Sequence, residues 1–175
     1  KGWDFLSCVG GVKLTRVGEV DDEGLKTSHF EWLQGDNGKK ALITDFDWPK
    51  SPLHMRVKGS VKDAALTAGT QDLASYAYQF MFSPVPMKDT VTLNLTTGKK
   101  LNQYQYKINA EQQMLEVAGT QYKTLHLVPP EQNKPQTETK ELWLSVDHHF
   151  VPVRIMMIDE SGQKLEQTLT ELHVE

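Results

Sequence analysis

The chain has 175 residues and a mass of 19.9 kDa, which is enough for one core, and we expect a single domain over residues 1–175. Its 19 basic and 23 acidic side chains give a net charge of -4 with no basic block, which argues against nucleic acid as a partner. No apolar run approaches the roughly 20 residues that a membrane-spanning helix needs. The chain starts at Lys1, so we expect the exported part of a slightly longer precursor.

Short segments with alternating apolar and polar residues dominate the sequence, and this period of two is typical of strands. Turn signals rich in Gly, Asp and Asn separate them, as at Asp21–Gly24 and Gly35–Gly38. The opening third therefore predicts a β-meander. The predicted strands cover residues 10–20, 25–33, 40–48, 53–57, 90–96, 101–108, 114–117, 121–127, 141–146, 151–159 and 164–174.

One segment shows a helical period. Between Gln71 and Phe82, apolar residues recur at spacings of three and four, with Thr70 placed as an N-cap and Pro84 just past the end. This pattern predicts an α-helix at about residues 71–82. The expected fold is mainly β: a curved antiparallel sheet, or a partly open β-barrel or sandwich, with this one embedded helix.

Four segments together resemble a known family. They are Ala68–Ser75 (AGTQDLAS), Tyr122–Leu127 (YKTLHL), Glu141–Ser145 (ELWLS) and Val151–Ile155 (VPVRI). In this order they are similar to the domain of unknown function 3108 family, whose members are predicted exported proteins of Gram-negative bacteria. The resemblance implies a β fold and a periplasmic or outer-membrane-associated location. It implies no catalytic residue and no cofactor.

Two of these segments carry residues with a physical role. Leu142 and Leu144 share one face of their strand and Trp143 lies on the other, so Trp143 could meet Arg154 across a hairpin as a cation–π pair. The alternative is an Arg154 that faces a ligand. Asp72 lies in the first turn of the predicted helix, where its charge suits the helix dipole.

The residues that could carry metal or nucleophilic chemistry form no convincing site. His148 and His149 are adjacent, so a turn explains them better than a metal site, and the other histidines are scattered singly. Cys8 is the only cysteine, and a buried or half-buried thiol is the expected state. Asp45 and Asp47 could pair on one strand face, although a solvated edge accounts for them. We therefore expect no metal, no cofactor and no catalytic residue.

The remaining distinctive feature is an excess of aromatic and methionine side chains. They could simply fill the core, or they could line an apolar cavity between sheet and helix. Our first hypothesis is a non-enzymatic cell-envelope protein that binds a hydrophobic ligand or an acylated partner there. The alternatives are a structural or interaction module that uses a sheet edge or the loop Pro129–Thr137, and, third, an enzyme. The candidate ligand-binding residues are Tyr76, Phe80, Met81, Trp143 and Arg154.

Overall fold

The computed structural model describes residues 2, 5–9, 11–35, 40–82, 89–109, 111–130, 139–158 and 161–170. These residues group into two compact units, and each is treated by itself. Unit 1 contains Lys1–Phe82 and Leu93–Tyr104, and unit 2 contains Ser83–Thr92 and Gln105–Glu175. The expectation of a single domain stays a prediction.

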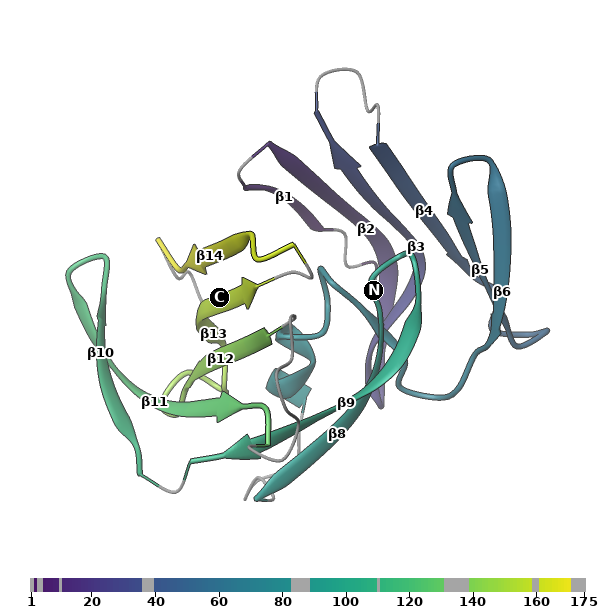
Figure 1. The fold of residues 1–175 in the computed structure, drawn as a ribbon. Helices are drawn as coiled ribbons and strands as arrows, with labels where there is room; N and C mark the ends of the chain where they lie inside the picture. The colour runs from purple at the N-terminus through teal and green to yellow at the C-terminus, as the bar shows by residue number, and fades with distance from the viewer. Residues whose placement is uncertain are drawn as a thin grey trace. The chain divides into compact units, whose positions relative to one another are not determined.

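Unit 1 is built on a six-stranded antiparallel meander, in which strands that follow each other along the chain also pair (Figure 1). This confirms the predicted mainly β class and the β-meander of the opening third. The strands are β1 (Phe5–Val9), β2 (Val12–Asp21), β3 (Gly24–Gln34), β4 (Lys40–Phe46), β5 (Pro52–Val57) and β6 (Ser60–Ala65). No apolar alternation predicts β6, whereas β1 contains Cys8, for which the sequence leads us to expect an early strand.

Tight turns set the register of the hairpins. At the β5–β6 turn, Lys58 and Gly59 both have positive φ, 50° and 79°. Two such residues in succession fit the type I′ turn, whose twist matches that of paired strands. Ala118 and Gly119, with φ of 51° and 81°, repeat this geometry between β10 (Gln113–Val117) and β11 (Thr120–Val128) in unit 2.

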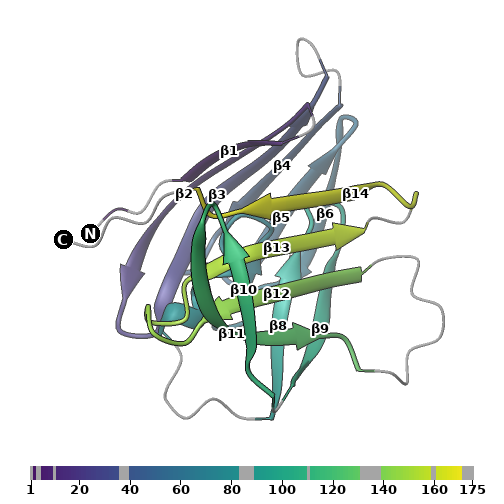
Figure 2. The same cartoon turned by 90° about the vertical axis from the view of Figure 1, so that its left-hand side faces the viewer.

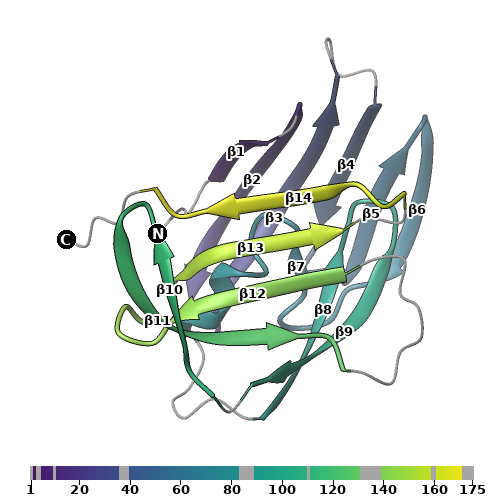
Figure 3. The same ribbon diagram turned by 60° about the vertical axis from the view of Figure 1, so that its left-hand side comes forward.

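A second sheet continues through the rest of the chain in the order β14-β13-β12-β11-β9-β8-β7, with β10 paired to β11. In unit 2, β11 to β14 form antiparallel neighbours (Figure 2), and β10 lies beside β11 (Figure 3). The remaining strands are β7 (Gln71–Asp72), β8 (Thr90–Thr96), β9 (Leu101–Ile108), β12 (Thr139–Ser145), β13 (Pro152–Ile158) and β14 (Lys164–Thr168). Residues of β8 and β9 belong to both units.

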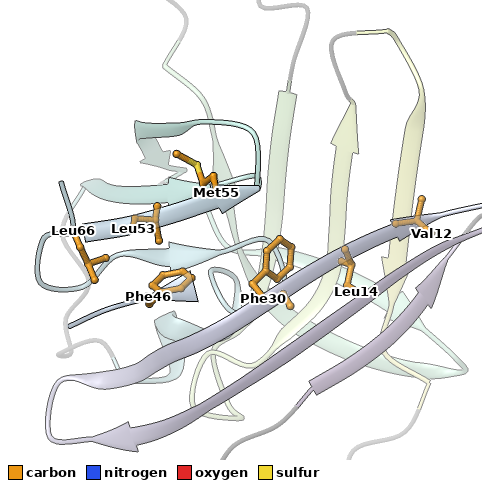
Figure 4. Close-up of a cluster of buried hydrophobic side chains, with 8 residues drawn as sticks. Val12, Leu14, Phe30, Phe46, Leu53, Met55 and Leu66 are labelled. Atoms are coloured by element: carbon orange, nitrogen blue, oxygen red, sulfur yellow. The ribbon is translucent and has the colours of Figure 1, made fainter. Parts of the chain in front are cut away.

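The apolar core of unit 1 lies on one face of the meander (Figure 4). Phe30, Leu53 and Met55 are completely buried. Burying one such side chain contributes about 1.5–3 kcal/mol to folding, so this face dominates the stability of the unit. Val12, Leu14, Phe46, Leu66 and Ala74 complete the cluster.

The α-helix predicted over residues 71–82 is wrong. Gln71 and Asp72 form the short strand β7, residues 73–77 form turns, and Tyr78–Phe82 form a single 3-10 helix, η2. Side chains determine the local backbone here. The Asp72 carboxylate accepts hydrogen bonds from the backbone N–H groups of Ala74 (2.7 Å) and Ser75 (3.0 Å), which favours a compact turn over a continuous α-helix.

Asp72 is also one end of a buried polar connection to the meander. Arg16 Nε donates to the Thr27 hydroxyl at 2.9 Å, and that hydroxyl donates to Asp72 Oδ2 at 2.5 Å. Arg16 Nε lies 3.7 Å from the same carboxylate oxygen, and both side chains are fully buried. The connection joins β2, β3 and β7, so Asp72 ties the segment after β7 to the sheet and does not serve a helix dipole.

Polar bonds to β3 hold the same segment in place further along. Gln71 Nε2 donates to the Leu25 carbonyl at 2.9 Å, and Gln79 Oε1 accepts the Leu25 N–H at 2.8 Å. Strand β3 also contains an irregularity in its pairing, because the β2–β3 register shifts by one residue between Val17 and Gly18. A Cβ at Gly18 would lie 2.4 Å from the Lys26 backbone carbonyl oxygen and 2.6 Å from the Arg16 guanidinium, so glycine is required at this position.

We expect Asp72→Asn to lower the free energy of unfolding by about 3–5 kcal/mol, because it removes the carboxylate charge that faces the buried Arg16. Asp22→Asn, in the exposed β2–β3 turn, is the control and should change stability by less than about 0.5 kcal/mol. Urea denaturation followed by tryptophan fluorescence measures both. A loss below about 1 kcal/mol for Asp72→Asn would show that the ion pair is not needed.

Candidate functional site

The structure separates the five candidate ligand-binding residues into two sets. Tyr76, Phe80 and Met81 lie in unit 1, on the segment after β7, whereas Trp143 and Arg154 lie in unit 2, on β12 and β13. Each set is therefore a separate candidate site.

In unit 1, Tyr76 is 1% exposed and Phe80 is 3% exposed, whereas Met81 is 38% exposed. The Tyr76 hydroxyl is enclosed and has no hydrogen-bond partner within the described part of the chain. Burial raises the pKa of this phenol, and the neighbouring phenols of Tyr104 and Tyr78 raise it further. Tyr76 therefore stays protonated and keeps a proton to donate.

Unit 1 contains a second enclosed hydroxyl, on strand β4. Thr44 on β4 pairs with Phe30 on one side and Met55 on the other, and all three side chains are buried. Its Oγ1 also has no partner among the residues that the structure describes. Enclosed hydroxyls nearly always have a partner, which can be a bound water or a ligand.

In unit 2, a row of three side chains crosses neighbouring strands. His126 on β11, Trp143 on β12 and Arg154 on β13 are direct cross-strand partners. The His126 ring stacks on the indole at 4.4 Å with an interplanar angle of 12°, and the Arg154 guanidinium lies 4.6 Å from the indole ring centroid. The predicted Trp143–Arg154 pair is confirmed, and His126, which is isolated in sequence, joins it through the β11–β12 pairing.

Polar contacts hold the members of this row in place. Arg154 donates to Glu166 at 3.1 Å, and the Trp143 Nε1–H donates to Gln113 Oε1 at 3.1 Å. Burial lowers the pKa of His126 and the Arg154 charge adds to this effect, while Glu141, with an oxygen 3.8 Å from His126 Nε2, opposes it. The side-chain amide of Asn109 lies 3.3 Å from His126 Nδ1, which fits a neutral ring protonated on Nε2.

A polar pocket of about 350 Å³ opens beside this histidine. Two of its lining residues, Glu111 and Gln112, come from the β9–β10 connection and are exposed. The other lining residues are Asn109, Gln113 and His126. Four of the five lining residues lie between positions 109 and 113, and His126 joins them only when β11 pairs with β9 and β10, so no local pattern predicts the complete pocket.

Histidines on unit 1 that are isolated in sequence also gain partners. His29, Asp45, His54 and Asp63 are successive cross-strand partners on β3 to β6, so they share one face of the sheet. His29 Nδ1 lies 2.6 Å from Asp45, and His54 Nδ1 lies 2.6 Å from Asp63. Among the described residues, no group of three histidine, cysteine or carboxylate ligands could hold a metal ion.

Other candidates for chemistry have structural explanations. His148 and His149 lie in the turn after β12, as expected. Ser145 Oγ lies 2.8 Å from His148 Nδ1, but Ser145 is completely buried, so the contact serves the turn. The Cys8 side chain, His173 and residues 131–137 of the predicted interaction loop lie outside the described residues. No helix in the described part is long and apolar enough to cross a membrane.

The described residues thus define a mainly β protein of two sheet-containing units with separate polar and apolar candidate sites. Residues 5–170 match the family model described as protein of unknown function (DUF3108), and the chain belongs to this family. The expected resemblance is confirmed over nearly the whole chain. Searches of curated proteins and of solved structures found no match.

The pKa of His29 gives a pH prediction. Partial burial disfavours the protonated ring, but hydrogen bonds to Glu31 and Asp45 and their negative charges outweigh burial and raise the pKa above 6.5. The folded state therefore binds this proton more tightly than the unfolded state, and its contribution is complete below pH 6.5 and is lost as pH rises through the folded pKa.

His29 contributes a fall in the free energy of unfolding as pH rises from about 6 to about 8, whereas the lowered pKa of His126 contributes a rise, and we expect His29→Gln to remove the falling component. Asp45→Asn should reduce this component too, because it removes one stabilising carboxylate, whereas Asp22→Asn should not. Urea denaturation at several pH values measures this. An unchanged pH profile in His29→Gln would refute the assignment.

A double-mutant cycle tests the indole–guanidinium contact. We expect Trp143→Leu and Arg154→Met to be coupled by about 0.5–2 kcal/mol in free energy of unfolding. The matched control pairs Trp143→Leu with Arg56→Met, an arginine in unit 1, and should be additive within about 0.5 kcal/mol. Equal coupling in both cycles would contradict a specific contact.

Proposed function

We propose that this protein is a non-enzymatic cell-envelope protein that binds an apolar molecule, or the acyl chain of a modified partner, in unit 1 beside Tyr76. The resemblance to predicted exported proteins supports the envelope location. The observation that carries the binding proposal is the enclosed Tyr76 hydroxyl without a partner.

Leaving a buried hydroxyl without a partner costs about 1–3 kcal/mol, so its retention needs a compensating role. A bound ligand with an apolar body and one polar group would supply that role. The apolar body of the ligand would pack against the core, and its polar group would accept a hydrogen bond from the Tyr76 hydroxyl. Thr44 Oγ1, on the sheet of the same unit, is a second enclosed hydroxyl without a partner among the described residues. Two residues close to Tyr76 in the chain, Ala77 and Phe80, are apolar and buried.

The local backbone is suited to admitting a ligand. The 3-10 helix η2 spans only Tyr78–Phe82, and 3-10 hydrogen bonds are weaker than those of an α-helix. Met81 and Phe82 at its end are 38% and 43% exposed, so apolar surface faces solvent next to the buried aromatic side chains. A small shift of η2 would open a route between them.

Interaction through a sheet edge is the second candidate. Strand β6 is an edge of the unit 1 sheet, and its Val61 is 59% exposed. A partner strand could add there through backbone hydrogen bonds. Its Lys62 and Asp63 are also exposed, and edge charges commonly discourage such pairing, so this function has less support.

The test uses cis-parinaric acid, a fluorescent apolar probe with one carboxyl group. We expect saturable binding, and Tyr76→Phe should weaken it about five- to tenfold because one hydrogen bond to the probe is lost. The ligand-free variant should unfold at equal or higher free energy, since an unsatisfied hydroxyl is removed. Organic extraction and lipid analysis of gently purified protein then identify any natural ligand.

Tyr122→Phe is the matched control, because Tyr122 is a buried tyrosine of unit 2. It should leave probe binding unchanged. If Tyr76→Phe lowers the stability of the ligand-free protein and leaves binding unchanged, the hydroxyl has a structural role and the proposal fails. Absence of probe binding to the wild type would equally reject it.

A further inference from the structure

We propose that unit 2 holds a separate binding site for a neutral saccharide, in the polar pocket between the β9–β10 connection and β11. The site is independent of the apolar ligand proposed for unit 1. At about 350 Å³ the pocket reaches the lower end of the volumes that small ligands occupy. Its lining consists of side chains with hydrogen-bonding groups: Asn109, Glu111, Gln112, Gln113 and His126.

Two of these side chains are held in fixed orientations. Asn109 Nδ2 contacts His126 Nδ1, and its backbone N–H donates to the His126 carbonyl at 3.1 Å. Gln113 Oε1 accepts from Trp143 Nε1, and the Gln113 carbonyl accepts from the Thr124 hydroxyl at 2.7 Å. These bonds use one end of each carboxamide, so the Asn109 oxygen and the Gln113 NH₂ group are the ends that can meet a ligand. Fixed partners reduce the entropy that binding costs.

The charge of the pocket lining indicates which chemical class of ligand can bind. Glu111 carries a negative charge, no cation lines the pocket within the described residues, and burial keeps His126 largely neutral by lowering its pKa. An anionic ligand would therefore meet a like charge without a counter-ion. A saccharide hydroxyl both donates and accepts, so it can match carboxamide, carboxylate and imidazole groups together.

The geometry also argues against an aromatic or apolar ligand. Trp143 is 6% exposed and its indole already contacts the His126 ring and the Arg154 guanidinium, so it offers no free stacking surface. Hydrogen bonds must then provide most of the affinity. In an open site these compete with water, and we expect a dissociation constant on the order of 1 mM.

The experiment is saturation-transfer NMR on the whole chain with N-acetylglucosamine and with glucose, each titrated to about 10 mM. We expect saturable binding of at least one sugar. Glu111→Gln and Gln112→Ala should each weaken binding about three- to tenfold, because each removes or weakens one hydrogen bond. Both residues are exposed, so neither variant should affect folding.

Gln105→Ala is the matched control, an exposed glutamine of unit 2 on β9 that does not line the pocket. It should bind like the wild type. Sugar binding that is lost equally in Gln105→Ala would place the site elsewhere and overturn the proposal. So would saturable binding of acetate or inorganic phosphate displaced by neither sugar, or the absence of sugar binding up to about 10 mM.

Discussion

The fold of unit 1 depends on placing a fully buried arginine where its charge is compensated. Arg16 points to the same face of β2 as the apolar residues Val12 and Leu14, and it is tolerated there because Thr27 and Asp72 meet it. Enclosure raises the pKa of the Asp72 carboxyl, and Thr27, Arg16 and the backbone N–H groups oppose this rise. A network of this kind adds little net stability, but each member is costly to remove. The requirement also explains the irregular backbone around it: glycine at position 18 and a turn after β7.

Strand positions could be predicted because an alternation with a period of two depends only on residues that are close together in the sequence. The same reasoning failed at residues 71–82, where apolar spacing fits an α-helix equally well. What decides the conformation there is the Asp72 side chain, which bonds to the backbone of Ala74 and Ser75 while also reaching Thr27 on a distant strand. A spacing rule cannot contain a contact between residues 45 positions apart. Strand β6 was missed because all but one of its residues are exposed and no apolar alternation marks it.

The candidate sites show the same division between local and distant information. Trp143 and Arg154 could be paired from sequence because β12 and β13 are consecutive strands of a hairpin. His126 belongs to the row only through the β11–β12 register. A sequence pattern does not reveal this register, because a long connection separates the two strands. His29 and His54 likewise lack sequence neighbours but lie one strand apart on either side of Asp45. Which side chains become partners across several strands depends on the order and register of those strands, and the sequence pattern does not contain this information.

The discontinuous course of unit 1 limits how the chain can be divided. The unit takes Lys1–Phe82 and then, after a return to unit 2, takes Leu93–Tyr104. Within the second piece, Gly98 lies so close to Leu42 that an added Cβ would be 2.9 Å from the leucine Cβ. A single break in the backbone therefore yields no fragment that carries unit 1 and nothing else. A chain shortened after residue 82 would contain the meander without the second piece of its own unit.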